Sequence, residues 1–104
     1  MKTNKLWVDD LRPAPAGWIW AKNARQAIAR LYGGGIAELS LDHDLGDRTE
    51  ATGYAVAAWL EAQAAAGRWA VVPKTIRTHS ADPAGTANIA AAAAAIERMR
   101  EVVP

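Results

Sequence analysis

Two spacings of apolar residues alternate along the chain, and they predict strands interleaved with helices. In residues 38–45, ELSLDHDL, Leu39 and Leu41 alternate with polar residues, which is the period of a half-buried strand. Between residues 24 and 31 the apolar positions recur three or four residues apart, the spacing of an amphipathic helix. The glycines at 33–35 then supply the stop that a helix C-terminus favours.

Strand-forming residues, caps and breakers predict the remaining elements. Further strands are expected at residues 5–11, 18–20 and 74–80. Two more helices are expected, one from the region of Val56 to Gly67 and one from Pro83 to the end of the chain. Asn23 and Asp82 are the predicted N-caps of the first and third helices. One face of the third helix is expected to hold its apolar residues, Ile89, Ala92, Ala93, Ile96, Met99 and Val103.

The order β, β, α, β, α, β, α predicts an α/β fold, a three-layer arrangement around a mainly parallel four-stranded sheet with right-handed connections. Two prolines and a glycine exclude a helix between the first two strands: Pro13, Pro15 and Gly17. With 104 residues and 51% hydrophobic content, we expect one domain, residues 1–104.

Composition narrows the classes of protein and of site. The absence of cysteine excludes disulfides and thiolate metal sites, and it suits the cytoplasm. No apolar stretch has the length of a signal or a membrane span, so no membrane partner is expected. A net charge of +1 predicts no strong nucleic-acid surface. Without a basic stripe, Trp18, Trp20 and Trp69 indicate core or partner surface better than base stacking.

Acidic residues gather where the predicted strands end. The carboxyl ends of parallel strands meet at one edge of an open sheet, and ligands bind there. The first and third strands deliver Asp9, Asp10, Asp42 and Asp44 to this edge. Because neighbouring carboxylates repel one another, a cation stabilises them, and magnesium prefers such oxygen ligands together with phosphate oxygens. We therefore predict a Mg²⁺ site at this edge, with Asp10 and Asp42 together as the favoured ligands. For any one aspartate alone, a capping or loop role is the better interpretation.

Both histidines of the chain fall at the same predicted edge. His43 and His79 form a candidate acid and base pair, because imidazole titrates near neutral pH. Arg12 and Ser80 are candidate phosphate-binding residues, through a guanidinium fork and a hydroxyl. A hydrogen bond from each histidine to a backbone carbonyl, and a turn role for Ser80, are the alternatives.

Four segments resemble a response-regulator receiver domain: VDDLR, WAKNARQAI, LSLDHDLGDRTEATGY and THS. In that family an acidic pair and a third aspartate bind magnesium, and the third aspartate accepts phosphate. The resemblance transfers these roles to Asp9, Asp10 and Asp42, with Thr78 or Ser80 near the hydroxyl position. The chain departs from the family because no lysine follows Lys74 and there is no room for a fifth strand or for the usual first helix.

The departures resemble a narrower group, the cyclic-phosphate processing receiver-like domain, in which LDHDLG is followed by HS and a DP or NP dipeptide. The resemblance covers nearly the whole chain and implies binding or processing of cyclic phosphates on nucleotides or RNA ends. The residues that match its motif are Asp10, Asp42, His43, Asp44, His79 and Ser80, with Asn88 as a further candidate. Asp82 stands where asparagine is commoner.

Three functions follow from these observations. The leading one is a metal-dependent phosphoesterase or phosphate-binding domain, in which Asp42, Asp44, His43 and His79 carry the chemistry on a phosphate-containing small molecule or an RNA end. The second is a signalling receiver that switches partners when Asp42 is phosphorylated. The third is a catalytically inert module that binds a nucleotide or a protein partner.

Overall fold

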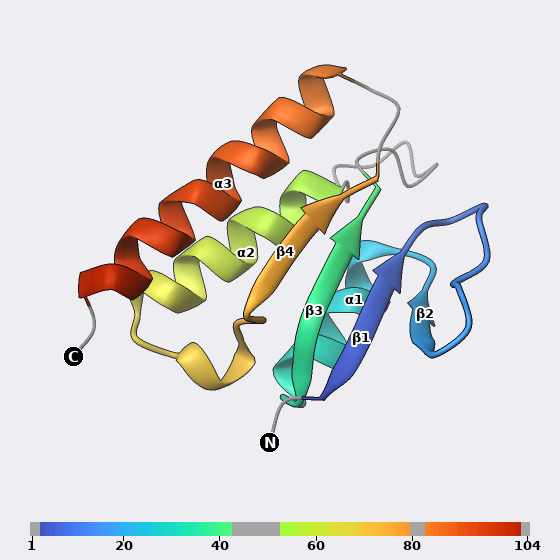
Figure 1. Ribbon diagram of the computed structural model, residues 1–104, viewed down its shortest axis with the longest axis horizontal. Coiled ribbons are helices and arrows are strands. Elements are labelled where there is room, and N and C mark those ends of the chain that lie inside the picture. The colour runs from blue at the N-terminus through green and yellow to red at the C-terminus, as the bar shows by residue number, and fades with distance from the viewer. Residues whose placement is uncertain (1–2, 43–52, 80–82, 103–104) are drawn as a thin grey trace.

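A parallel sheet organises the chain in the computed structural model, which describes residues 3–42, 53–79 and 83–102 (Figure 1). Its four strands follow the order β2-β1-β3-β4, and all three pairings are parallel. The strands are β1 (Asn4–Val8), β2 (Trp18–Ala21), β3 (Ile36–Leu41) and β4 (Thr75–Thr78). The predicted fold class, α/β with a four-stranded parallel sheet, is confirmed.

Three of the four strands end earlier than predicted, whereas β2 continues one residue further, to Ala21. The first was expected to reach Leu11, but β1 ends at Val8 because the carboxylate of Asp9 accepts hydrogen bonds from the amides of Leu11 and Arg12 and turns the chain. The third strand ends at Leu41, and residues 43–45 of its predicted range lie outside the described residues. The polar residues therefore follow the strands instead of extending them.

The predicted helices are present, and each begins or ends near its expected signal. They are α1 (Ala24–Tyr32), α2 (Gly53–Ala65) and α3 (Pro83–Val102), and a short 3₁₀ helix, η1 (Trp69–Val71), was not predicted. Asn23 caps α1 as expected, since its side chain accepts a 2.8 Å hydrogen bond from the amide of Gln26. After α1 the backbone enters the left-handed region at Gly34, with φ of +77°, which explains the glycines there. Asp82 lies outside the described residues.

All three of these helices lie on one face of the sheet, so the described molecule has two layers where three were expected. The connections from β2 to β3 through α1 and from β3 to β4 through α2 run in the same direction across the sheet, so their common right-handedness places both helices on the same side. α3 packs against α2 and β4. Figure 1 shows the strands from the opposite face. Residues 9–17, which join β1 to β2, form no helix that could cover it.

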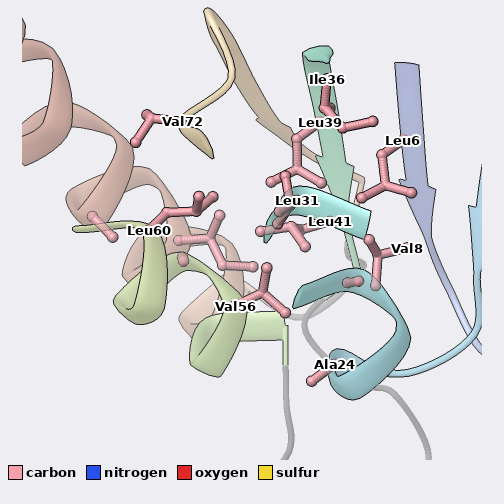
Figure 2. Packing of buried hydrophobic residues seen from close by; sticks show 14 of the residues in the cluster. Leu6, Val8, Ala24, Leu31, Ile36, Leu39, Leu41, Val56, Leu60 and Val72 are labelled. Atoms are coloured by element: carbon pink, nitrogen blue, oxygen red, sulfur yellow. The ribbon is translucent and has the colours of Figure 1, made fainter. Parts of the chain in front are cut away.

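The core fills the space between the sheet and the helices (Figure 2). Leu6, Val8, Leu39 and Leu41 point from β1 and β3 into this layer and are fully buried. The helices meet them with Leu31, Val56, Leu60, Ile89 and Ile96. The other residues of the same strands, such as Trp7 and Ser40, belong to the opposite face because side chains alternate along a strand. We call this the open face of the sheet. Among the described residues no helix is long and apolar enough to cross a membrane.

Candidate functional site

Three side chains meet where β1, β3 and β4 end. The backbone ladder continues one residue beyond the paired strands: the amide of Asp42 donates to Val8, and that of His79 donates to Leu41, at 2.9 and 3.0 Å. These bonds place Asp9, Asp42 and His79 next to one another at the carboxyl edge. One carboxylate oxygen of each aspartate and one ring nitrogen of His79 lie within 4.8 Å of one another. We call Asp9, Asp42 and His79 the edge triad.

Asp9 is the fully buried member of the edge triad, with none of its surface exposed. Its Oδ1 accepts hydrogen bonds from the amides of Leu11 and Arg12, each 2.9 Å long, and its Oδ2 faces His79. The guanidinium of Arg12, whose side chain is 56% exposed, approaches Oδ2 to 3.5 Å. Burial alone raises the pKa of Asp9, but the hydrogen bonds from the amides and from His79 outweigh it and bring the pKa below its ordinary value. Asp9 is therefore a carboxylate at neutral pH.

His79 is held at both ring nitrogens and across its ring face. Nε2 lies 3.0 Å from Oδ2 of Asp9, and Nδ1 lies 2.7 Å from the hydroxyl oxygen of Ser40. The ring stacks on Trp7 with centroids 3.7 Å apart and planes inclined by only 5°. Burial lowers the pKa of His79 more than the nearby carboxylates of Asp9 and Asp42 raise it. His79 is consequently a neutral imidazole at neutral pH, and Nε2 donates because its partner is a carboxylate.

Two tryptophans fasten the loop that carries Asp9. The indole nitrogen of Trp20 donates a 2.7 Å hydrogen bond to the carbonyl of Asp9, and that of Trp7 donates a 2.9 Å bond to the carbonyl of Arg12. The rings of Trp18 and Trp7 form a T-shaped pair, with centroids 6.0 Å apart. The β1–β2 loop contains no helix, and these half-buried indoles hold it in place instead.

The other residues predicted for the site have different positions. Asp10 is half-buried and lies outside the edge triad. Thr78 donates its hydroxyl to the carbonyl of Leu41 at 3.0 Å, which extends the sheet ladder. Asn88 is exposed on α3. The remaining predicted site residues, His43, Asp44 and Ser80, lie outside the described residues. Their roles stay predictions.

Ser40 and Trp7 are contacts of His79 that sequence reasoning missed. Ser40 stands between the core leucines of β3, so its alternation shows only that it faces away from the core. Its partner is 39 residues further along the chain. Strand register supplies the missing signal, because Ser40 pairs with Trp7 in β1 and with Arg77 in β4. This register brings His79, which directly follows β4, into contact with Trp7 and Ser40.

The donor set of the edge triad suits a divalent cation. Asp9 and Asp42 are 0% and 7% exposed, and burying two carboxylates together is unfavourable unless positive charge accompanies them. Within the described residues, Arg12 is the cation paired with Asp9, and most of its side chain is in solvent. Oδ2 of Asp9 and the carboxylate of Asp42 are oxygen donors of the kind that Mg²⁺ prefers, and water or phosphate oxygens would complete its shell.

Comparison with known protein families gives a match over most of the chain. A family model described as the cyclic-phosphate processing receiver domain matches residues 4–95. The matched span runs from β1 into α3 and contains the whole edge triad. Searches of curated proteins and of solved structures found no significant match.

Proposed function

The chain belongs to the family of cyclic-phosphate processing receiver domains, and from this premise we propose that it binds a cyclic phosphate ester and opens it by hydrolysis at the edge triad. The observation that carries the proposal is the convergence of two buried carboxylates and a neutral imidazole within 4.8 Å, beside an exposed guanidinium. A phosphate monoanion needs positive charge and a proton donor, and this edge offers sites for both.

The carboxylates would hold a divalent cation, for which we propose Mg²⁺. Asp42 and Oδ2 of Asp9 face the same space, and Asp10 is the third ligand that the sequence predicts. Once bound, the cation would neutralise the two carboxylates and stabilise charge on the phosphate oxygens. Arg12 would add a fork donor to those oxygens, because its exposed side chain already reaches the rim of the triad.

His79 would supply the proton for the ester oxygen that leaves. In hydrolysis, water forms a bond to phosphorus, one ring P–O bond breaks, and the released oxygen takes a proton. His79 would give up its Nε2 proton from the imidazolium form, in which Nδ1 is protonated as well, so that a neutral imidazole remains, and Asp9 orients the ring. The proton lost by the attacking water then returns to His79. His43, Asp44 and Ser80 remain predicted participants, the first two in the chemistry and Ser80 on the phosphate.

The partner and the compartment belong to the same proposal. We infer that the ligand is a nucleotide or an RNA end, because these are the molecules on which cyclic phosphates occur. The cysteine-free composition fits action in the cytoplasm.

The test is turnover of 2′,3′-cyclic and 3′,5′-cyclic nucleotides in the presence of Mg²⁺, followed by separation of the products. We expect the wild-type chain to open at least one of them and His79→Gln to reduce the rate by about 10²- to 10⁴-fold, the usual contribution of a proton donor. Arg12→Ala should weaken the reaction as well. Arg77→Ala is the matched control, since Arg77 is also an exposed arginine in an ion pair but lies on the open face beside Glu38.

Two results would contradict the proposal. One is that no cyclic phosphate is bound or opened under any of these conditions. The other is a gain of one phosphoryl group on incubation with a small phosphodonor, seen by intact-mass measurement and absent in Asp42→Asn. That gain would identify a signalling receiver instead.

A further inference from the structure

The contact between Ser40 and His79 joins the open face of the sheet to the edge triad. Ser40 lies in the middle of a row formed by Trp7, Ser40 and Arg77 on neighbouring strands. Its hydroxyl oxygen is 2.7 Å from Nδ1 of His79, and the imidazole lies parallel to the indole of Trp7. The ring is therefore held at one nitrogen by β3 and across its face by β1.

We propose that Ser40 is a positioning residue, which keeps the imidazole of His79 in the orientation and tautomer that present Nε2–H to Asp9. The proposal deepens the proposed function and rests on it for the use of that proton. The orientation itself does not depend on any reaction.

The hydrogen-bond partners define the tautomer. Oδ2 of Asp9 is a carboxylate oxygen and only accepts, so in the resting site Nε2 carries a proton as long as the ring keeps the orientation in which Nε2 faces Oδ2. Nδ1 then needs a partner that can donate to it in the neutral ring and accept from it in the protonated ring. A hydroxyl fulfils this condition, because Ser40 donates to a bare Nδ1 and accepts from a protonated one after a rotation of its O–H. A backbone carbonyl would accept only, and it would favour the other tautomer.

A turn of the ring by half a revolution is also opposed by these contacts. It would place ring carbons against Oδ2 of Asp9 and against the hydroxyl of Ser40, and both hydrogen bonds would be lost. Tilting is opposed by Trp7, since stacking with a plane angle of 5° needs the two rings to stay parallel. Removal of the hydroxyl of Ser40 takes away one of the two hydrogen bonds that define the orientation.

Burial decides between this role and nucleophilic attack by Ser40. A hydroxyl, an imidazole and a carboxylate in a hydrogen-bonded series are also the arrangement of an activated serine nucleophile. However, Ser40 is only 5% exposed, and His79 occupies the position next to its oxygen. An attacking oxygen needs open space in line with the bond that breaks, so Ser40 acts through His79 and does not contact the substrate.

The test is ¹⁵N NMR of the histidine side chains of the full chain, without substrate, metal or phosphate. The ¹⁵N shifts identify which ring nitrogen carries the proton. We expect a single Nε2–H form for His79 in the wild type. Ser40→Ala should lose this single form and show both tautomers, and Ser40→Thr should restore it because threonine keeps the hydroxyl and suits a strand. Thr75→Ala is the control, since it removes a hydroxyl from the neighbouring strand β4.

Each outcome bears on the proposal. An unchanged His79 spectrum in Ser40→Ala would overturn it, and so would covalent labelling of Ser40 by a fluorophosphonate, which would make Ser40 a nucleophile. If Ser40→Ala does not fold, Ser40→Cys replaces it, because the thiol keeps the size of the side chain and is a weak hydrogen-bond donor. Since the spectra need no substrate, their result is independent of whether a cyclic phosphate is opened.

Discussion

At the scale of single residues, Asp9 combines a structural task with a position in the candidate site. Its Oδ1 accepts the amides of Leu11 and Arg12 and so forms the start of the β1–β2 loop. Its Oδ2 faces His79 and the space that Asp42 shares. Hydrogen bonds to a charged group each contribute roughly 1.5–3 kcal/mol, so the loop and the triad are energetically linked through one side chain.

The pH dependence of stability is a prediction at this scale. The pKa values of both Asp9 and His79 are lowered in the folded chain, from ordinary values of 3.8 and 6.5. A group with a lowered folded pKa binds more protons in the unfolded chain, so its contribution is complete above the ordinary value and is lost as the pH falls below it. We therefore expect the free energy of unfolding to fall below pH 6.5 through His79 and to fall further below pH 3.8 through Asp9.

Urea unfolding between about pH 7.5 and about pH 3 measures this slope, which for one proton does not exceed about 1.4 kcal/mol per pH unit. The chain has two histidines, so the measurement uses a His43→Gln background in which His79 is the only histidine. Adding His79→Gln should flatten the slope just below pH 6.5. A slope unaffected by that change would show that charging His79 does not destabilise the fold. Among the described residues, the charged groups that act on His79 are Asp9, Asp42 and Arg12.

At the scale of elements, the β1–β2 loop distinguishes this sheet from one with a helix in each connection. Residues 9–17 return the chain beside β1 without a helix, and β2 still pairs in parallel with β1. Two indole donors hold the loop to the open face, Trp20 at the carbonyl of Asp9 and Trp7 at that of Arg12. The loop thereby keeps Asp9 and Arg12 at the edge where His79 lies.

Trp20→Phe tests this support. Phenylalanine keeps an aromatic ring but loses the 2.7 Å hydrogen bond to Asp9, so we expect a loss of about 0.5–1.5 kcal/mol in the free energy of unfolding. Amide hydrogen exchange should accelerate at Leu11 and Arg12, whose amides bind Asp9. Trp18→Phe is the control, because Trp18 contacts Trp7 ring to ring in a T-shaped pair. Equal acceleration in both variants would contradict the loop-fastening role.

At the scale of the whole molecule, one core lies on one side of the sheet. The leucines of β1 and β3 face α1, α2 and α3 (Figure 2). The other face carries Trp7, Ser40 and Arg77. The candidate site lies at the carboxyl edge and shares the open face through Ser40 and the stacked ring of His79. The hydrophobic core thus lies on one side of the sheet, and the contacts of His79 with Ser40 and Trp7 lie on the other.

This separation predicts that substitutions in the core reduce the free energy of unfolding more than substitutions on the open face. Leu39→Ala removes a fully buried side chain and should cost about 2–5 kcal/mol, whereas Arg77→Ala on the open face of the adjacent strand should cost less than about 1 kcal/mol. The urea midpoints of the two variants measure the difference. Comparable losses would show that the open face is packed as tightly as the core.

The sequence by itself determined the elements and the end of the sheet at which the site lies. Apolar periods, the cap at Asn23 and the glycines after α1 are local signals, since they act between residues only a few positions apart. The parallel sheet followed from the order of the elements, and this order placed Asp9, Asp42 and His79 at a common edge. Polar residues that directly follow parallel strands gather at one edge whatever the order of the strands, because all the strands point the same way.

Only the tertiary structure decided the layering, the partners and the charge states. The single helical layer follows from the strand order β2-β1-β3-β4, which no local pattern encodes. The contact of Ser40 with His79 and the stacking of His79 on Trp7 depend on register between strands far apart in sequence. The lowered pKa values of Asp9 and His79 likewise arise from burial and from neighbours that folding brings together.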